Sequence, residues 1–368
     1  MNDYFFISSP LHFLIAANVA IQHPQHHEVA VLISKDRTAA ARYRAAAEKH
    51  PEIFSRVLDL SPAAARGRRG RAAAFRDLRA EFARPMTARL FTGNDRRLEF
   101  QYAMHTASRA NPQVTGIYLD EGMVTYAGHK SMHRLAHRWL DPLCKKLYYG
   151  RWYRPAVTTG ASAWIDTVHA AFPAAVHPLL KTKPVQAIDV APFKSPALRS
   201  LASALLEGHP DYPELLGGIK VVYTLPHEGA YRKSPEAYAA IGRRLGQYVR
   251  PAAIAIKPHP RMTRPDLPAR MFPGSILLDH RLGLEAMLPL LGDDCIVVGD
   301  ISSTLLTTRW LRPDLTVWAL VPEEGTVGGM AALYRRLGIP LVHSGRLGEC
   351  LAGECPPARP GEWTTEGM

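Results

Sequence analysis

Two adjacent carboxylates, Asp120 and Glu121, follow an apolar run in the stretch GIYLDEGMVTYAG, residues 116–128. The apolar run predicts a strand, and Gly122 predicts a turn directly after the acids. Two like charges side by side in a poorly solvated position repel, which raises the pKa of one of them. Such a carboxyl group can accept the proton of a substrate hydroxyl, so the pair is a candidate general base. A plain polar turn at a strand end would have the same residue types.

A rigid histidine follows a second apolar run, in the stretch IAIKPHP at residues 254–260. Pro258 and Pro260 restrict the backbone on both sides of His259. An imidazole held in this way at a strand end suits a hydrogen-bond donor or acid that faces a phosphate or a carboxylate, and Lys257 adds positive charge. The alternative is a surface turn with a satisfied histidine.

Three consecutive hydroxyl residues, Ser302, Ser303 and Thr304, follow a third apolar run that ends at Gly299 and Asp300. Hydroxyls at a helix start cap free N–H groups, and the same N–H groups bind phosphate with the help of the helix dipole. Capping alone needs only one hydroxyl, so the run predicts a phosphate site. Together the three segments indicate group transfer from a phosphate-bearing donor to a hydroxyl acceptor.

The elements around these segments alternate between short apolar strands and amphipathic helices, which predicts an α/β fold with mostly parallel sheets. The alternation stops in the proline-rich zone 155–217, interpreted as the end of a first domain and a linker with some helix, and then restarts. We therefore expect a domain at 1–205, a second at 206–345 and a tail at 346–368. Ligands of open α/β sheets bind beyond the carboxyl ends of the strands, where all three segments fall.

The charge of the 368-residue chain, +12, implies an anionic partner. Positive residues concentrate in blocks 66–84 and 133–154, and the second block interleaves them with tryptophan, tyrosine and leucine. That mixture predicts contact with an anionic membrane surface, although an ordinary amphipathic helix would have the same pattern. No nucleic-acid-binding motif is present, so we expect no nucleic-acid partner.

The chain has no apolar run long enough to span a bilayer. Its four cysteines have no metal-type clustering apart from the last pair, and we expect all four to be free thiols. These features predict a cytoplasmic protein that binds the inner face of the cytoplasmic membrane peripherally.

The order of the motifs, acid-acid-Gly, then His-Pro, then Ser-Ser-Thr, resembles that of bacterial sialyltransferases and polysialyltransferases of the GT-B fold. The N-terminal stretch FISSPLHFLIAANVAI extends the resemblance, and bacterial Kdo transferases are similar in the same features. The resemblance implies two Rossmann-like domains with parallel sheets that face each other across a cleft. It also implies inverting, metal-independent transfer, without a cofactor, from a CMP-activated nonulosonic acid to a hydroxyl of a capsule or lipooligosaccharide glycan.

The resemblance also implies roles for individual residues. Asp120 would be the general base, with Glu121 as its partner or as the base itself, and His259 would protonate or hydrogen-bond the departing CMP phosphate. The other expected donor-site residues are Lys257, Pro258, Gly299, Ser302, Ser303, Thr304 and Pro226 of the PHEG loop. The expected acceptor-side residues are Ser9, Pro10, His12 and Gly122. Two alternatives stay open: a CMP-Kdo transferase on the same scaffold, and a non-catalytic protein that binds glycan or membrane.

Overall fold

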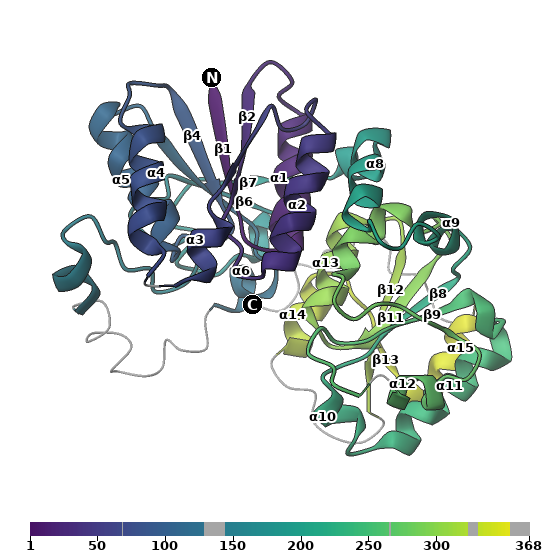
Figure 1. Cartoon of the computed structure of the whole chain (residues 1–368). Helices are drawn as coiled ribbons and strands as arrows, with labels where there is room; N and C mark the ends of the chain where they lie inside the picture. Colours follow the sequence, from purple (N-terminus) through teal and green to yellow (C-terminus); the bar gives the residue numbers. More distant parts are fainter. Residues whose placement is uncertain (68, 129–143, 265, 323–329, 354–368) are drawn as a thin grey trace. The chain divides into compact units, whose positions relative to one another are not determined.

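The chain forms two compact units, Met1–Glu207 and Gly208–Met368, each built around one parallel sheet (Figure 1). This architecture confirms the predicted α/β class. The computed structural model describes residues 1–67, 69–128, 144–264, 266–322 and 330–353. Within these residues, no helix is long and apolar enough to cross a membrane.

The first unit has a seven-stranded sheet in the order β3-β2-β1-β4-β5-β6-β7. Its strands are β1 (Asn2–Ile7), β2 (His27–Leu32), β3 (Arg56–Asp59), β4 (Ala88–Thr92), β5 (Thr115–Leu119), β6 (Thr167–Ala170) and β7 (Val185–Ala187). Its helices are α1 (Pro10–Ile21), α2 (Arg37–Lys49), α3 (Ser61–Ala65), α4 (Arg71–Phe82), α5 (Leu98–Ala110), α6 (Met123–Ala127) and α8 (Pro196–Leu205). The chain passes outward from β1 to β3 and returns beside β1 as β4, so the direction of winding changes between β1 and β4.

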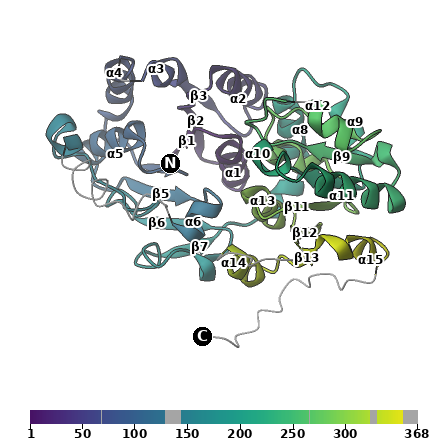
Figure 2. The same ribbon diagram turned by 90° about the horizontal axis from the view of Figure 1, so that it is seen from below.

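Helices cover both faces of this sheet: α1, α2 and α8 pack on one face and α4 and α5 on the other (Figures 1 and 2). A parallel strand covered on both faces is apolar along its length, as β1 is from Tyr4 to Ile7. The helix after β1 begins where Ser9 accepts a hydrogen bond from the backbone N–H of His12 (3.2 Å), with Pro10 in the first helical position.

The second unit has a six-stranded sheet in the order β10-β9-β8-β11-β12-β13. Its strands are β8 (Val221–Thr224), β9 (Ile254–Lys257), β10 (Ile276–Leu277), β11 (Ile296–Asp300), β12 (Thr316–Val321) and β13 (Leu341–His343). Its helices are α9 (Tyr212–Gly217), α10 (Glu228–Tyr231), α11 (Pro235–Tyr248), α12 (Asp266–Met271), α13 (Ser303–Leu311), α14 (Met330–Arg336) and α15 (Leu347–Leu351). The winding changes direction between β8 and β11.

Two local predictions need correction. The zone interpreted as the end of the first domain and a linker with some helix also contributes β6 and β7 to the first sheet. Cys350 is disulfide-bonded, whereas Cys144 and Cys295 are free as expected.

A buried carboxyl group without a partner lies at the amino-terminal edge of the first sheet. Glu28 is 4% exposed, and neither of its carboxylate oxygens has a hydrogen-bond partner among the described residues. The neighbouring strand places Asp3 opposite it, and Arg89 pairs with Asp3 (Nε to Oδ1, 2.8 Å). Burial, together with the charge of Asp3, raises the pKa of Glu28 to about 8.

Replacing Glu28 with glutamine is expected to remove a pH dependence of stability. Between pH 4.5 and about 8 the folded protein keeps a proton on Glu28 that the unfolded chain has released. The free energy of unfolding therefore falls as the pH rises through this window, by up to about 1.4 kcal/mol per pH unit. Urea unfolding at several pH values across this range measures the slope for wild type and for Glu28→Gln. An equal slope in both proteins would contradict the assignment.

Candidate active site

The predicted acidic pair and the acceptor-side residues lie at the carboxyl edge of the first sheet, on the loops that follow adjacent strands and in the first turn of α1. Ser9 follows β1, Asn94 follows β4, and Asp120 and Glu121 follow β5. This edge includes the change of winding between β1 and β4, which is the usual ligand position in open α/β sheets. The structure therefore brings together Ser9, Pro10, His12, Asp120, Glu121 and Gly122.

Asp120 is fully buried, and both of its carboxylate oxygens are occupied. One oxygen accepts hydrogen bonds from the Gly122 N–H and the Thr125 hydroxyl, both at 2.8 Å. The other accepts from the Tyr126 hydroxyl and from the Ala171 N–H (2.9 Å). Burial raises the pKa of Asp120, and these four donors oppose that rise. Asp120 thus joins the loops after β5 and β6 and offers no free oxygen to a substrate.

Gly122 adopts φ = +78°, a backbone conformation that side chains other than glycine rarely accept. This conformation turns the Gly122 N–H back toward Asp120. The glycine after the two acids is therefore required by the turn that holds Asp120.

Glu121, the next residue, keeps 24% of its side chain exposed. Its Oε1 accepts a weak hydrogen bond from Asn94 Nδ2 (3.3 Å), and no described residue hydrogen-bonds Oε2. Partial burial is the main cause that raises the pKa of Glu121 to about 8, and the charges of Asp95 and Asp120 add to it. Glu121 therefore combines an accessible carboxylate oxygen with a proton affinity suited to a base near neutral pH.

His12, in the first turn of α1, lies beside Glu121. Its Nε2 is 3.8 Å from Glu121 Oε1, too far for a hydrogen bond, and its Nδ1 is 3.0 Å from Ser8 Oγ. Burial, with a contribution from the nearby Arg97, lowers the pKa of His12 to about 4, so this imidazole is neutral at physiological pH. A Cβ on Gly93 would lie 2.1 Å from His12 Nε2, so only glycine fits after β4.

The donor-side residues predicted from the sequence lie at the carboxyl edge of the second sheet. The ends of the adjacent strands β9, β8 and β11, the loops that follow them and the first turn of α13 provide all of them: Pro226, Lys257, Pro258, His259, Gly299, Ser302, Ser303 and Thr304. This edge includes the change of winding between β8 and β11, so it is again the expected ligand position.

The imidazole of His259 is held as a hydrogen-bond donor. Its Nδ1 accepts a hydrogen bond from the Arg261 N–H (3.1 Å), so the neutral ring carries its proton on Nε2. Burial, followed by the charges of His227, Arg261 and Lys257, lowers the pKa of His259 below its ordinary value. The group that His259 offers to a ligand is therefore a neutral Nε2–H.

His227 belongs to the PHEG loop expected at the donor site, although the sequence interpretation assigned it no role of its own, and it has the same arrangement on the loop after β8. Its Nδ1 accepts a hydrogen bond from the Gly229 N–H (3.1 Å), and its ring centroid lies 5.3 Å from that of His259. The repeated Pro-His pair, at 226–227 and again at 258–259, was the available sequence signal. The two loops thus place two imidazoles close together, each with its Nδ1 occupied by a backbone N–H.

Glu228 joins these two loops. Its carboxylate accepts hydrogen bonds from the Thr263 N–H (2.8 Å), the Thr263 hydroxyl (2.7 Å) and the Arg264 N–H (3.2 Å). These bonds tie the start of α10 to the loop after β9. The spacing of the two histidines is therefore set by backbone and buried contacts, and not by the imidazoles themselves.

Ser302 occupies the N-cap position of α13, but its side chain makes no capping hydrogen bond. Its hydroxyl is buried and has no partner among the described residues, while its backbone N–H donates to the Tyr334 hydroxyl (2.9 Å). An unpartnered hydroxyl beside the free N–H groups of a helix start is an arrangement suited to phosphate. Capping, the alternative interpretation of this run, does not account for the Ser302 hydroxyl.

Two predicted donor-site residues have structural explanations. The Lys257 ammonium donates to the carbonyl oxygens of Pro258 (2.9 Å) and His280 (3.4 Å), and burial lowers its pKa to about 8. A Cβ on Gly299 would lie 2.0 Å from Thr224 Oγ1 on β8, so glycine lets the two strands pair closely. Both residues shape the site from within the protein.

Solved structures resemble almost the whole chain. An alpha/beta-galactoside alpha-2,3-sialyltransferase from the luminous marine bacterium Photobacterium phosphoreum matches with a TM-score of 0.57 at 12% identity, covering 94% of this chain and 98% of that one. A UDP-N-acetylglucosamine 2-epimerase matches with a TM-score of 0.54 at 13% identity, covering 94% and 83%. No family model matches the sequence, and no curated protein matches it either. The likeness shows the fold: the chain has the two parallel-sheet units of the GT-B fold, as its resemblance to bacterial sialyltransferases predicted.

Proposed function

We propose that this protein is an inverting glycosyltransferase that moves a nonulosonic acid, sialic acid or a relative, from a CMP-sugar to a hydroxyl of a bacterial capsule or lipooligosaccharide glycan. The observation that carries the proposal is the set of donors at the edge of the second sheet: the Nε2–H groups of His227 and His259, with the unpartnered Ser302 hydroxyl near the start of α13. These hydrogen-bond donors suit a phosphate that gains negative charge as it leaves. The GT-B fold and the sialyltransferase among the similar structures support it.

In the proposed reaction, the acceptor oxygen forms a bond to the anomeric carbon as the bond from that carbon to the CMP phosphate oxygen breaks. Glu121 takes the proton of the acceptor hydroxyl, and the electron pair of the broken bond leaves with CMP. His259 and His227 donate hydrogen bonds to the departing phosphate. Attack opposite the leaving group inverts the anomeric centre in one displacement. Each preorganised donor of this kind typically contributes ~3–4 kcal/mol to transition-state stabilisation.

This assignment places the base function on Glu121, because the oxygens of Asp120 are occupied by protein donors. In the same assignment, hydrogen-bond donors of the protein stabilise the negative charge of the departing phosphate. We therefore propose that transfer needs no metal ion or cofactor.

A panel of activated sugars tests the donor class. We expect CMP release from CMP-sialic acid or CMP-Kdo, no nucleotide release from UDP-N-acetylglucosamine, and no effect of EDTA on the rate. Chromatography of the released nucleotide measures each reaction, with boiled protein as the control. Faster release from CMP-Kdo than from CMP-sialic acid would select the Kdo transferase.

Three other results would contradict the proposal. Conversion of UDP-N-acetylglucosamine would favour a reaction like that of the epimerase among the similar structures. Loss of activity in EDTA, restored by magnesium, would refute metal independence. Binding of a glycan or a membrane without turnover of any donor would indicate a non-catalytic protein.

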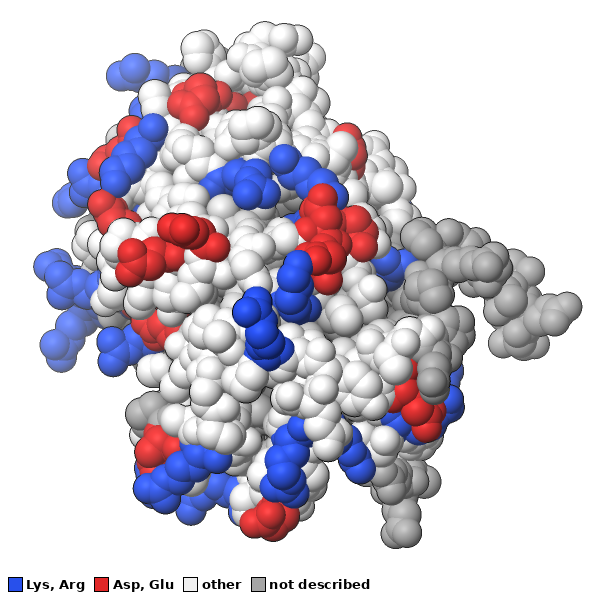
Figure 3. Space-filling model, turned by 90° about the vertical axis from the view of Figure 1, so that its right-hand side faces the viewer, with Lys and Arg blue, Asp and Glu red and all other residues white. Residues whose placement is uncertain are grey.

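The charge distribution supports a peripheral location for the first unit. This unit contains 28 lysines and arginines against 16 aspartates and glutamates, whereas the second contains 17 of each, so the entire excess of +12 lies in the first. On the face of the molecule in Figure 3, basic and acidic residues are interspersed. We propose that the first unit contacts the anionic inner face of the cytoplasmic membrane, which carries a lipid-linked acceptor. Of the predicted contact segment 133–154, residues 133–143 lie outside the described residues.

A further inference from the structure

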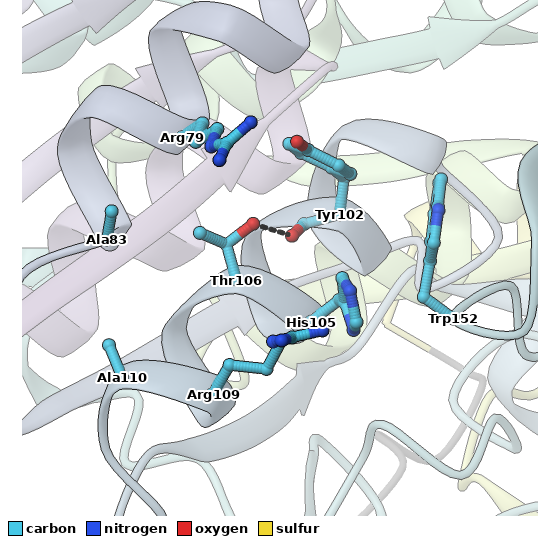
Figure 4. Close-up of a pocket in the computed structure, with 8 residues that line it drawn as sticks. All are labelled: Arg79, Ala83, Tyr102, His105, Thr106, Arg109, Ala110 and Trp152. Carbon is cyan, nitrogen blue, oxygen red and sulfur yellow. Dashed lines mark hydrogen bonds between the residues drawn. The ribbon is translucent and has the colours of Figure 1, made fainter.

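A cavity of about 520 Å³ in the first unit is lined by residues of α4 and α5 and by Trp152 (Figure 4). Arg79 on α4 faces the cavity from one side. Tyr102, His105, Thr106 and Arg109 line it from α5, and Trp152 closes one end. None of these residues belongs to the candidate active site.

The lining is positively charged and contains no carboxylate. Arg79 and Arg109 are exposed, and neither has an acidic partner among the described residues. The acids of α4 are engaged elsewhere, since Asp77 pairs with Arg76 and Glu81 with Arg56. Burial is the main cause that lowers the pKa of His105 below its ordinary value, and the charges of Arg109 and Arg154 add to it. The cavity therefore favours an anion.

The aromatic end of the cavity is rigid. The Trp152 ring packs against Tyr102 (centroids 5.4 Å apart), against Phe75 on α4 (5.6 Å) and against His105 (6.2 Å). The two guanidinium groups are thus placed beside a fixed aromatic wall. Guanidinium groups bind phosphate in a bidentate geometry, which makes a phosphate-bearing ligand the best match.

The chain next to Trp152 exposes apolar side chains. Leu147 is 80% exposed and Tyr148 is 76% exposed, and the exposed cations Lys146 and Arg151 flank them. Arg71 of α4 holds this segment through a hydrogen bond to the Tyr149 hydroxyl and lies 5.1 Å from the centre of the Tyr149 ring. An anchored segment that exposes apolar side chains between cations is typical of a surface that inserts into the membrane interface.

We infer that this cavity binds the phosphate of an anionic phospholipid headgroup while Leu147 and Tyr148 enter the interfacial region of the bilayer. The inference rests on the membrane contact in the proposed function and specifies its site, but it does not depend on the catalytic residues. The exposed apolar pair favours a lipid over a soluble phosphate, because a soluble ligand would leave both side chains in water.

Sedimentation with vesicles tests this inference. We expect wild type to bind phosphatidylcholine vesicles that contain 30% phosphatidylglycerol, and not vesicles of phosphatidylcholine alone. Arg79→Gln with Arg109→Gln is expected to lower the vesicle partition coefficient at least about tenfold, since each cation near an anionic surface adds to the attraction. The matched control is Arg37→Gln with Arg199→Gln, which removes the same charge from exposed positions on the other face of the same sheet. An equal loss in the control would overturn the inference.

Two further measurements make the test specific. Leu147→Ser with Tyr148→Ser is expected to reduce vesicle binding at unchanged net charge, and binding equal to wild type would overturn the inference. Binding of glycerol 3-phosphate or of a single-stranded oligonucleotide in place of vesicles would also overturn it. Unchanged thermal unfolding of the variants confirms that they fold.

The vesicle assay is independent of the donor assay. The arginine variants are expected to release CMP at the wild-type rate in vesicle-free solution. A failure of the donor panel with intact vesicle binding would refute the proposed reaction alone, and the reverse result would refute the headgroup site alone.

Discussion

Replacing Glu121 with glutamine is expected to lower kcat for sugar transfer by about 10²–10⁴-fold, the usual contribution of a general base. Glutamine keeps the shape of the side chain and removes its ability to accept a proton. The effect should appear in kcat and not in the affinity for CMP, because the base acts on the acceptor hydroxyl in the transition state. Initial rates of CMP-sugar consumption, together with calorimetric titration of CMP, separate the two quantities.

The pH profile provides a second measurement of the same assignment. A general base must be ionised, and burial raises the pKa of Glu121 to about 8. The transfer rate should therefore rise about tenfold per pH unit below that value and level off above it. In Glu121→Gln the remaining rate should lack this rise. A wild-type profile that is flat between pH 6 and 9 would contradict the assignment.

Asp120→Asn is the matched control, since it changes the neighbouring acid in the same way. The Asp120 carboxylate accepts four hydrogen bonds inside the protein, so the substitution is expected to lower the free energy of unfolding by about 1–3 kcal/mol. Glu121→Gln removes a carboxyl group whose pKa is raised to about 8, so its unfolding free energy should exceed that of wild type increasingly as the pH rises above 4.5. If folded Asp120→Asn lost transfer and Glu121→Gln kept it, the roles of the two acids would be reversed.

Replacing His259 with leucine is expected to lower kcat by about 10²–10³-fold, the typical loss when one donor to a developing negative charge is removed. His227→Leu should also lower kcat. The wild-type His227 ring lies on the adjacent loop, and its Nδ1 accepts a backbone hydrogen bond as that of His259 does. Both variants should also bind CMP more weakly. Kinetics with a CMP-sugar and titration with CMP measure the two effects.

Glutamine at position 259 distinguishes hydrogen bonding from proton transfer. Its side-chain amide offers an N–H near the position of the imidazole Nε2, but it cannot give up a proton near neutral pH. We expect His259→Gln to recover part of the rate lost in His259→Leu. Equal losses in the two variants would show that His259 transfers a proton, contrary to the neutral donor that the structure supports. Nitrogen chemical shifts of the histidines report directly whether the ring proton is on Nε2.

The main architecture could be predicted from local patterns. Apolar runs of four to seven residues that alternate with amphipathic segments indicated most strands of both sheets, because parallel strands covered on both faces must be apolar along their length. The strands that were missed, β6 and β7, have four and three residues and lie in a proline-rich zone. Strands that short are stabilised by pairing with a neighbour, and a local pattern does not contain that information.

The positions of the candidate site residues could also be predicted, because parallel strands in one sheet end at the same edge. Asp120, His259 and Ser302 each follow an apolar run, and each lies at such an edge in its own unit. The pairing of His227 with His259 was not evident, since it depends on Glu228 joining two loops that are more than thirty residues apart in the chain.

The sequence by itself determined that two acids end a strand in the first unit, and that an imidazole and a hydroxyl end strands in the second. Only the tertiary structure decided which acid is available. Successive side chains at the end of a strand point in opposite directions, so one of two neighbours enters the protein and the other does not. Asp120 meets Tyr126 and, from a different strand end, the backbone of Ala171, whereas Glu121 keeps an oxygen free. Those partners are distant in the sequence or depend on the fold of the loop. They decide which carboxylate is enclosed by protein donors and which one stays accessible to a substrate.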